Sequence, residues 1–586
     1  MSLHPFYQNF LDRVNSQTSG FDSLENIPKW LEVNTKDPRD NQKLWSFEDH
    51  EYQIDILKDP SDEGCIQKCS QVGASELSVR LMLALLALMR SVTGIYVLPT
   101  TGFARKFAKQ RVDSVISNSK ALSEVVNKDV DSSELKQLGQ SFLYIAGSFG
   151  QSSAISIPAA ILFKDEVDFC NQETLTTYNS RLGHNKPGEY FNRSFSTPTV
   201  LNFGINKLFE KSSQAYYTVK CRTCYDWVAP SFFENVRIPG YDDSLLNFEK
   251  EDLWLPSVDV SKATLHCPSC NGVIPHTDLC DPSKRQWVRK YPDRSISGYQ
   301  ISPYDVPGIN PIARTIQQIE EYEYKKDWAN FKVGVPFEDA ENSFVKESIK
   351  KMSVRDGFSY PDEADERRLQ TGSVFGLDVG KISHFTLLTP IHGKPVITYA
   401  ERIRQDGDNY LGKRVLHLCR VFGVVRGVVD AGPDISVSKY LVDNAVHGLI
   451  WACYYARTAK NKLESLSFDE AEQVVSAFRT GTFDQLVRKV NGGHLRYGEF
   501  AEKELHLEHL SVLKRVSTKN DAGDELVSWV STGDDHYGHS LNYANMAWNM
   551  REDLFSNPSV IPCGPGIGKA KMKELETPME IKSYKV

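Results

Sequence analysis

The segment Ala160-Ile161-Leu162-Phe163-Lys164-Asp165-Glu166 ends an apolar run with two adjacent carboxylates. Single acids end two later runs: Asp378 follows Val374-Phe375-Gly376-Leu377, and Asp430 follows Val428-Val429. An acidic pair after a strand is typical of sites that hold magnesium and orient a water during nucleotide hydrolysis. Acids on neighbouring strands are typical of two-metal sites that cut phosphodiesters. These runs predict an α/β protein with two separate acidic sites.

Strand-like runs alternate with helical patterns between residues 50 and 212, which predicts a parallel sheet with covering helices. A second α/β pattern begins near residue 370, with helix signals at 468–478 and 543–551. We expect six parts: an N-terminal appendage (1–49), a nucleotide-binding core (50–212), a cysteine-containing insert (213–280), a subdomain with a charged linker (281–369), a second α/β domain (370–553) and a flexible tail (554–586).

Composition sets broad limits on the class of protein. The chain has 586 residues, of which 40% are apolar and 25% charged, as in soluble proteins of several domains. Its net charge of −8 neither supports nor excludes DNA as a partner, because a local basic groove is sufficient. The longest apolar run, Leu81 to Met89, is about half of what a bilayer requires. With no secretion signal evident, we expect a cytoplasmic protein without a membrane segment.

A candidate phosphate loop, Lys68-Cys69-Ser70-Gln71-Val72-Gly73-Ala74-Ser75-Glu76, precedes the acidic pair by about ninety residues. It lacks the usual Gly-Lys-Ser ending, but Gly73 permits close backbone approach and Ser75 offers a hydroxyl to magnesium. Lys68 is positioned to reach the phosphates from the other end of the loop. The alternative is a strand-to-helix turn with an incidental lysine.

The acidic pair favours the functional interpretation of this loop. Asp165 is expected to position magnesium and Glu166 to polarise the attacking water. Adjacent carboxylates after a strand are often only a solvated turn. A loop and an acidic pair in this order on one α/β pattern make nucleotide hydrolysis the better interpretation.

Several short segments, taken together, resemble a known family. They are Tyr52-Gln53, the lysine-first loop, Val97 to Thr100, Gly147-Ser148, Lys164 to Asp168 and Ser196-Thr197-Pro198-Thr199. Over most of residues 50–550 the chain resembles the large terminase subunits of tailed phages, particularly the lambda-type branch. The resemblance implies that Gln53 reads the adenine of ATP and that Ser196 and Thr197 couple hydrolysis to DNA movement.

One departure from this family lies in the loop. Many members carry an arginine there that stabilises transition-state charge, whereas this chain has Gln71 at the corresponding place. The arginine that stabilises this charge is therefore expected to be Arg80, Arg193 or a residue of a neighbouring subunit.

Four cysteines form two Cys-x-x-Cys pairs, Cys221-Arg222-Thr223-Cys224 and Cys267-Pro268-Ser269-Cys270. Two such turns supply four thiolates, which fit tetrahedral Zn²⁺ and leave no position for a catalytic water. We expect a structural zinc ribbon, and similar ribbons occur between motor and nuclease in lambda-type relatives. The alternative is reduced cysteines packed as small apolar side chains.

The second acidic set predicts an RNase H-like nuclease. That fold puts one acid in the middle of its first strand, one at the end of its fourth and one on a late helix. Asp378 and Asp430 suit the first two positions. For the third we select Asp535, with His539, which stands where many relatives have an aspartate, as an auxiliary ligand or catalytic histidine. Asp534 or Asp535 is alternatively the N-cap of the helix.

The expected fold is therefore α/β, with an N-terminal P-loop ATPase domain, a zinc-ribbon insert and a C-terminal RNase H-like nuclease domain. The resemblance implies an ATP-driven motor that packages phage DNA and cuts concatemers, using ATP, Mg²⁺ or Mn²⁺ and structural Zn²⁺. It also implies double-stranded DNA, a small terminase subunit and a portal protein as partners. We expect a ring of copies on the procapsid, in the host cytoplasm and not in the mature virion.

Two other classes stay open at this point. A helicase-nuclease would share both metal sites, but no room is left for a second motor lobe. A scaffold that binds DNA without cutting it, joined to a motor with a degenerate loop, would keep the fold and lose the chemistry.

Overall fold

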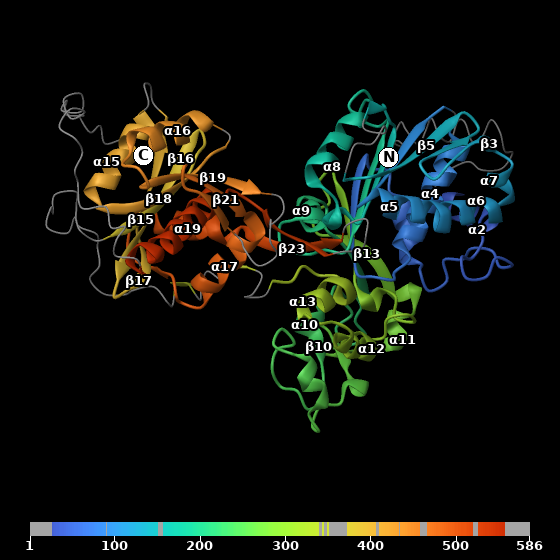
Figure 1. Cartoon of the computed structure of the whole chain (residues 1–586). Helices are drawn as coiled ribbons and strands as arrows, with labels where there is room; N and C mark the ends of the chain where they lie inside the picture. Colours follow the sequence, from blue (N-terminus) through green and yellow to red (C-terminus); the bar gives the residue numbers. More distant parts are fainter. Residues whose placement is uncertain are drawn as a thin grey trace. The chain divides into compact units, whose positions relative to one another are not determined.

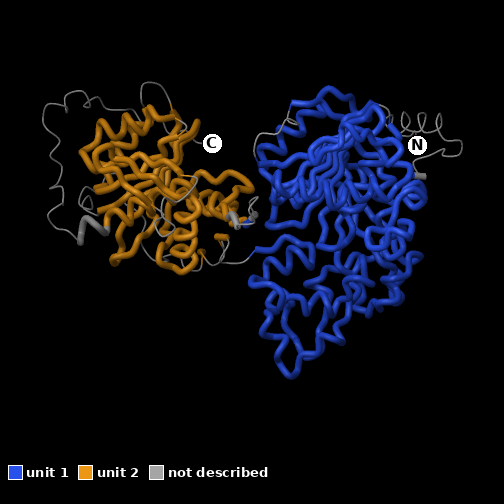
Figure 2. Tube along the Cα trace, turned by 45° about the vertical axis from the view of Figure 1, so that its right-hand side comes forward, with its two compact units in different colours: residues 1–338, 517–526 blue, residues 339–516, 527–586 orange. Residues whose placement is uncertain are grey.

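The computed structural model describes residues 26–89, 91–149, 156–338, 343–344, 349–350, 372–405, 410–432, 434–456, 466–519 and 525–556. The chain divides into two compact units (Figure 2), unit 1 with residues 1–338 and 517–526, and unit 2 with residues 339–516 and 527–586. The expected linker and tail lie mostly outside the described residues. Among the helices that are described, none combines the length and apolar character needed to cross a membrane.

Unit 1 is built on an 11-stranded sheet, counted over the described residues, in the order β13-β8-β14-β1-β7-β6-β2-β5-β4-β3, with β9 paired to β8. The neighbours from β8 through β14, β1, β7, β6 and β2 to β5 are parallel, and antiparallel strands extend both edges. The strands are β1 (Glu63–Lys68), β2 (Thr93–Leu98), β3 (Val126–Asp131), β4 (Leu135–Leu138), β5 (Ser141–Gly147), β6 (Ile161–Asp165), β7 (Phe191–Ser196), β8 (Ala215–Lys220), β9 (Trp227–Val228), β13 (Arg285–Arg289) and β14 (Ser297–Ile301).

Helices cover both faces of this sheet (Figure 1). Successive residues of β2 alternate between two buried clusters, with Tyr96 and Leu98 in one and Ile95 and Val97 in the other. One face carries α4 (Ala74–Leu88), α5 (Thr101–Phe107), η1 (Ala108–Val112), α6 (Asp113–Asn118) and α7 (Lys120–Ser123). The other carries α8 (Gln172–Asn179) and α9 (Gly204–Lys211). The predicted parallel sheet with covering helices is confirmed.

Residues 26–57 pack onto the core of unit 1. They include α2 (Asn26–Asn34) and α3 (Tyr52–Leu57). Ile27, Leu31 and Phe47 are buried in the same cluster as Leu83 of α4 and Ile66 of β1. The described part of the expected appendage is therefore attached to the core of unit 1 by apolar side chains.

The cysteine pairs belong to unit 1 and lie in a small region with its own buried cluster. A three-stranded sheet joins β10 (Val236–Arg237), β11 (Thr264–His266) and β12 (Val273–Ile274). Short helices surround it: α10 (Phe232–Asn235), α11 (His276–Leu279), α12 (Ile312–Gln317), α13 (Lys325–Trp328) and the π-helix η10 (Ala329–Val333).

Unit 2 contains an eight-stranded sheet, again counted over the described residues, in the order β20-β21-β19-β18-β15-β16-β17-β22. Its strands are β15 (Ser373–Asp378), β16 (Ile382–Ile391), β17 (Lys394–Arg404), β18 (Val424–Asp430), β19 (Ile450–Ala456), β20 (Leu466–Asp469), β21 (Val474–Phe478) and β22 (Arg496–Tyr497). Strands β15, β16 and β17 are antiparallel, while β18 and β19 run parallel to β15. This sheet therefore mixes antiparallel and parallel strands, in keeping with the predicted α/β domain, and the RNase H-like assignment stays a prediction.

Helices cover both faces of the eight-stranded sheet in unit 2. Val374 belongs to the cluster under α17 (Arg479–Asn491), α18 (Lys503–Ser511) and α19 (His536–Ser556). Phe375 and Leu377 belong to the cluster under α15 (Tyr410–Val421) and α16 (Ile435–Asn444). Gly376 lets α19 approach closely, because a Cβ there would lie 2.0 Å from the Ser540 carbonyl oxygen. A separate two-stranded sheet pairs β23 (Leu513–Lys519) with β24 (Glu525–Ser531).

One sequence prediction for unit 2 is wrong. Residues 468–478 were expected to be helical, but they contain the end of β20 and all of β21. Val474 to Phe478 alternates between half-buried and buried positions and pairs in parallel with β19. The non-local partner strand decides the conformation of this short apolar run. Asp378 ends its strand, as the apolar run before it predicts, although an RNase H-like fold puts this acid in the middle of its first strand.

Candidate functional site

The candidate phosphate loop connects β1 to α4. Strand β1 ends at Lys68, and α4 begins at Ala74 after Gly73, whose φ of 75° is left-handed. A Cβ on Gly73 would lie 2.9 Å from Gln53 Nε2, so both backbone conformation and space favour glycine. The Ser70 amide donates to the Phe331 carbonyl of η10 at 2.6 Å. Over the residues described, Gly73 gives α4 no side-chain cap, which leaves its first-turn N–H groups suited to an anion.

Lys68 and Glu166 form an ion pair beside this loop. Lys68 Nζ donates to Glu166 Oε1 at 3.1 Å, and the lysine side chain is only 7% exposed. Burial alone would lower the pKa of Lys68, but the charges of Glu166 and Asp165 outweigh it and raise the pKa. Glu166 has a left-handed φ of 53°, and its Oε2 is buried without a hydrogen-bond partner in the described structure. A carboxylate oxygen held in this way is placed to accept a proton from water.

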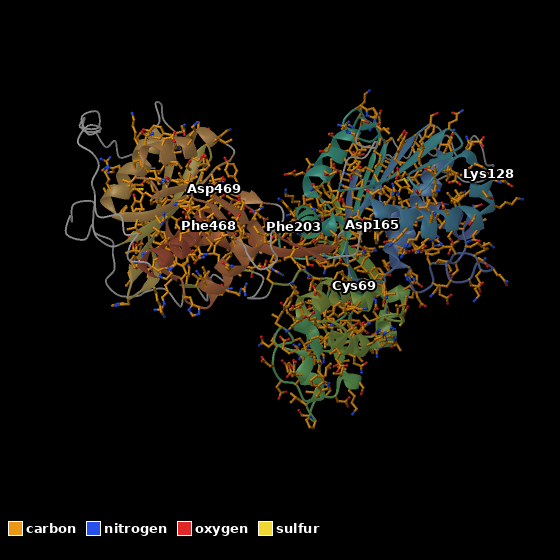
Figure 3. The ribbon with its side chains drawn as sticks, in the orientation of Figure 1. Cys69, Lys128, Asp165, Phe203, Phe468 and Asp469 are labelled. Atoms are coloured by element: carbon orange, nitrogen blue, oxygen red, sulfur yellow. The ribbon has the colours of Figure 1, made fainter. Side chains whose placement is uncertain are left out.

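Asp165, labelled in Figure 3, ends β6, and β7 lies between β6 and β1 in the sheet. Its Oδ2 accepts a hydrogen bond from the Tyr96 hydroxyl at 2.9 Å, and the Ser75 side chain lies near its carboxylate. Burial and the charge of Glu166 raise the pKa of Asp165. Ser75 and Asp165 therefore meet as a magnesium site requires, although they lie far apart in the sequence.

Gln53 lies against the phosphate loop. Its Nε2 donates to the Val72 carbonyl at 3.2 Å and to the Tyr52 hydroxyl at 3.1 Å. Its Oε1 is buried, and no described group hydrogen-bonds to it. An amide with one unsatisfied acceptor beside the loop suits recognition of a base, but contact with adenine stays a prediction.

Asp168 joins the acidic segment to the Ser-Thr-Pro segment, a connection that sequence reasoning missed. Its amide donates to Ser196 Oγ at 3.3 Å, and its Oδ2 accepts from the amide of Thr199 at 2.8 Å and from its hydroxyl at 2.7 Å. The Ile205 amide at the start of α9 donates to Oδ1 at 2.7 Å. Thr197 is buried next to these contacts. The segment with Ser196 and Thr197 is therefore held directly by the loop that carries Glu166.

The two candidate arginines within the chain are engaged elsewhere. Arg80 pairs with Glu76 and donates to the Lys36 carbonyl at 2.8 Å. Arg193 donates to the carbonyls of Ser61 at 2.7 Å and Asp59 at 3.2 Å. These contacts engage both guanidinium groups within unit 1. The source of this arginine, whether Arg80, Arg193 or a neighbouring subunit, stays a prediction.

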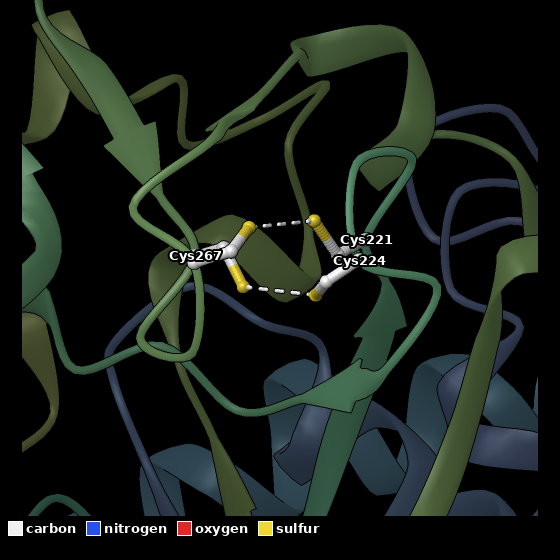
Figure 4. A group of neighbouring side chains, drawn as sticks. Cys221, Cys224 and Cys267 are labelled. Carbon is white, nitrogen blue, oxygen red and sulfur yellow. Dashed lines mark hydrogen bonds between the residues drawn. The ribbon is translucent and has the colours of Figure 1, made fainter.

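The four cysteines come together as predicted from their spacing (Figure 4). Sγ of Cys221 lies 3.7 Å from Sγ of Cys270, and Sγ of Cys224 lies 3.8 Å from Sγ of Cys267. A tetrahedral zinc with Zn–S bonds of about 2.3 Å separates its sulfurs by about 3.8 Å. This four-cysteine cluster therefore fits a zinc ion.

The two cysteine turns share one backbone design. Tyr225 and Asn271, each following the second cysteine of its pair, have left-handed φ of 64° and 57°. Their amides donate to the carbonyls of Cys221 and Cys267, both at 2.9 Å. Each turn thus folds back on itself and points its two sulfurs to the same side.

In unit 2, Asp378 and Asp430 end neighbouring parallel strands. The register pairs Leu377 with Val429, so the two acids follow at the same edge of the sheet. Burial, followed by the charge of Asp378, raises the pKa of Asp430 to about 6. The Tyr543 side chain of α19 lies near Asp430. The expected proximity of the first two acids is thus observed.

The expected third acid makes local contacts at the start of α19. Asp535 Oδ2 lies 3.3 Å from His539 Nε2, and the Asp535 carbonyl accepts from the His539 amide at 3.2 Å. His539 Nδ1 lies 3.2 Å from the Tyr455 hydroxyl. Asp535 therefore holds the N-cap position while its side chain bonds His539, and its role as a metal ligand stays a prediction.

A second group around Asp378 contains two histidines that the sequence reasoning did not select. Within the described residues, one ligand atom each of Asp378, His384 and His536 lies within 4.8 Å of the others. His536 Nδ1 lies 2.9 Å from Asp378 Oδ2, which raises the pKa of His536. The antiparallel register of β15 and β16 sets Asp378 opposite His384. The short turn between these strands is the signal that would have identified His384.

Comparisons with known proteins identify one matching family. Residues 45–280 match the family model of the phage terminase large subunit gpA, ATPase domain. No curated protein matches the chain. Among solved structures, the large terminase of bacteriophage HK97 is similar at 9% identity, covering 89% of this chain and 98% of that chain with a TM-score of 0.49.

Two further solved structures are similar to parts or most of the chain. The large terminase of a thermophilic bacteriophage in complex with ADP is 10% identical, with 82% of this chain and 93% of that chain covered and a TM-score of 0.28. The large terminase nuclease of thermophilic phage G20c with bound magnesium is 17% identical. The match covers 35% of this chain and 97% of that chain, with a TM-score of 0.23. Over residues 45–280, the family match supports the resemblance to terminase large subunits.

Proposed function

We propose that this chain, whose residues 45–280 match the terminase large-subunit ATPase family, couples ATP hydrolysis to movement of double-stranded DNA and cuts that DNA with a metal-dependent nuclease. One observation carries the proposal. Each unit brings carboxylates from its strands to the carboxyl edge of its own sheet, at Asp165 and Glu166 in unit 1 and at Asp378 and Asp430 in unit 2.

In unit 1, the loop from Lys68 to Ser75 would hold the phosphates of ATP through its lysine and the N-terminus of α4. Mg²⁺ bound at Ser75 and Asp165 would neutralise charge that develops on the transferred phosphoryl group. The Tyr96 hydroxyl orients Asp165 in advance of binding. Glu166 would accept the proton of the attacking water through its unpartnered oxygen, and Gln53 would contact the adenine.

The contacts of Asp168 suggest how hydrolysis reaches the DNA-moving segment. A shift of Glu166 on ATP cleavage would move Val167 and Asp168, the two residues that follow it. Because Asp168 holds the Thr199 backbone and the start of α9, Ser196 and Thr197 would follow this movement. This is the coupling role assigned to Ser196 and Thr197.

In unit 2, Asp378, Asp430 and Asp535 would bind two divalent ions, Mg²⁺ or Mn²⁺, with His539 as an auxiliary group. Ions held there activate a water and stabilise the leaving oxygen of a phosphodiester. Asp430 is partly buried beside the charge of Asp378, which disfavours its ionised form. A bound divalent cation would stabilise both carboxylates in their ionised forms.

The cluster of Cys221, Cys224, Cys267 and Cys270 would bind structural Zn²⁺. Four sulfur ligands complete a tetrahedral site, so zinc there supplies folding free energy and no chemistry. The ribbon would stabilise the insert that follows the motor core.

A protein that packages DNA would need further protein partners. A small terminase subunit would select the DNA, and a portal protein would receive a ring of copies of this chain. The protein would act in the host cytoplasm, on the procapsid only during packaging, and would be absent from the mature virion.

A pair of variants tests the proposal. Glu166→Gln is expected to abolish ATP turnover and spare cleavage of supercoiled plasmid, while Asp378→Ala is expected to do the reverse. ATPase is measured with and without DNA, and cleavage with Mg²⁺ and with Mn²⁺. Intact plasmid after incubation with the wild-type protein in both metals would favour a DNA-binding scaffold, and loss of both activities in either variant would contradict two independent sites.

A further inference from the structure

We propose that Asp378, His384 and His536 form a mixed oxygen and nitrogen site that binds a first-row divalent transition metal ion in preference to Mg²⁺. The inference rests on the proposed nuclease function and specifies its metal. The ion at Asp378 would then be bound by two imidazoles as well as by carboxylate oxygen.

The three side chains converge from separate elements. Asp378 ends β15, His384 lies opposite it on β16, and His536 begins α19. Their ligand atoms lie within 4.8 Å of one another, and His536 Nδ1 lies 2.9 Å from Asp378 Oδ2. Metal–ligand bonds of about 2.1 Å separate neighbouring ligands of an octahedral ion by about 3.0 Å and opposite ligands by about 4.2 Å. To enclose an ion, the group must contract and the more exposed His536 ring must turn out of its stack on His384, because an imidazole binds a metal in its own ring plane.

His384 supplies an independent indication of a ligand. The residue is 4% exposed, and its Nδ1 is buried with no hydrogen-bond partner among the described groups. A buried polar nitrogen without a partner is costly, so such a group is usually satisfied by an unseen water or ion. Its ring stacks on His536 with centroids 4.7 Å apart and planes 11° apart, and Tyr537 packs edge-on at 4.7 Å. This packing holds the imidazole in place before an ion binds.

The other groups near the site are already assigned to different contacts. His506 bonds the Thr386 and Tyr497 hydroxyls, and His509 accepts from the Tyr537 amide at 3.3 Å. Asp535 and His539 bond each other. The two imidazoles directed at Asp378 are therefore those of His384 and His536.

The ligand types decide the class of metal. Mg²⁺ prefers oxygen ligands and keeps several waters, whereas imidazole nitrogen favours first-row transition metals. Two histidines with one carboxylate form a set known from transition-metal sites. We therefore expect Mn²⁺ to bind at Asp378 at least about tenfold more tightly than Mg²⁺.

Mn²⁺ binding to the full, zinc-loaded chain tests the inference without relying on activity. Electron paramagnetic resonance titration gives the affinity, and electron spin-echo modulation detects ¹⁴N nuclei bound to Mn²⁺. Wild type should show imidazole nitrogen coupling. His536→Ala and His384→Asn should each weaken Mn²⁺ binding about tenfold or more and reduce the nitrogen signal. The control is His447→Ala, an exposed histidine in the same unit, which should match wild type.

The outcomes separate this inference from the proposed function. Mn²⁺ binding that is lost in Asp430→Asn but shows no nitrogen coupling would overturn the histidine site and leave the nuclease proposal intact. It would mean that His536 only hydrogen-bonds Asp378. Failure of wild type to bind Mn²⁺ in unit 2 would overturn both. Unfolding of His384→Asn is checked by circular dichroism, and the more exposed His536 then decides the test.

Discussion

Lys68 Nζ lies 3.1 Å from Glu166 Oε1, so the lysine expected to bind phosphate is paired with the carboxylate expected to activate water. Both groups lie at the carboxyl edge of the first sheet. A triphosphate carries more negative charge than one carboxylate, so ATP is expected to displace Glu166 from Lys68. Displacement would release the carboxylate for water only when nucleotide is bound.

Replacing Lys68 should therefore weaken nucleotide binding directly. In Lys68→Met, loss of one charge-assisted hydrogen bond to phosphate should lower affinity for a fluorescent ATP analogue about 10- to 100-fold. Lys128→Met, an exposed lysine on β3 of the same unit, is the matched control. Equal affinity of Lys68→Met and wild type would remove Lys68 from the phosphate site.

Gly204 tests the connection through Asp168. Gly204 has a φ of 48°, and a Cβ there would lie 2.2 Å from Asp168 Oδ1. Gly204→Ala should lower the free energy of unfolding by about 3 kcal/mol or more and reduce DNA-stimulated ATPase, because Asp168 must move. Gly139→Ala is the control, since Gly139 has a φ of 59° and nothing within 4 Å of the added atom.

The control variant Gly139→Ala measures the cost of the left-handed backbone conformation without a steric clash. Gly139→Ala should cost only about 1 kcal/mol, the penalty of a left-handed alanine. Equal losses of stability in the two variants, measured by urea unfolding, would show that the contact with Asp168 is unimportant.

Lys164 predicts a pH dependence of stability. Its ammonium is buried and donates to Asn179 Oδ1 at 2.8 Å, and burial lowers the pKa of Lys164 to about 8 from 10.5. Between about pH 8 and pH 10.5, Lys164 therefore binds more protons in the unfolded chain than in the folded one. The stability that Lys164 contributes consequently rises with pH in this window. Relative to Lys164→Met, wild type should gain about 2 kcal/mol between about pH 7 and about pH 9.5.

Urea unfolding of both proteins at the two pH values measures this difference. Lys120→Met, an exposed lysine in unit 1, should show no such change relative to wild type. A constant difference between wild type and Lys164→Met across the range would mean that Lys164 keeps an ordinary pKa in the folded state.

Removing zinc should unfold the insert selectively. The purified protein should contain about one zinc per chain, and Cys224→Ser should lose it, because three sulfurs bind zinc much more weakly than four. Buried Cys221 and Cys267 belong to the core of this region, so proteolysis should then cut near residues 221–280 first. Cys280→Ser, an exposed cysteine outside the group, is the control. Retention of full zinc by Cys224→Ser would contradict the four-sulfur site.

The candidate sites show which features local sequence could predict. The strands that carry Asp165, Asp378 and Asp430 were found because each is a continuous apolar run, as buried parallel strands require. The cysteine cluster was found because each pair lies within one turn. These signals involve neighbouring residues, so they survive without knowledge of the rest of the fold.

Other features depend on partners far away in the chain. Residues 468–478 were misread as helix because only pairing with β19 makes Val474 to Phe478 a strand. His384 and His536 stand 152 positions apart in the numbering and meet only where β16 and α19 pack together. Nothing in the sequence near either histidine indicates the other.

The primary structure alone determined the class of fold, the positions of the acidic strands and the pairing of the four cysteines, since hydrophobic runs and cysteine spacing are written in consecutive residues. Only the tertiary structure decided which groups face Asp378 and that Asp168 connects to Thr199. Register between strands and the docking of helices are set by packing energy summed over many distant contacts, and no single segment contains that information.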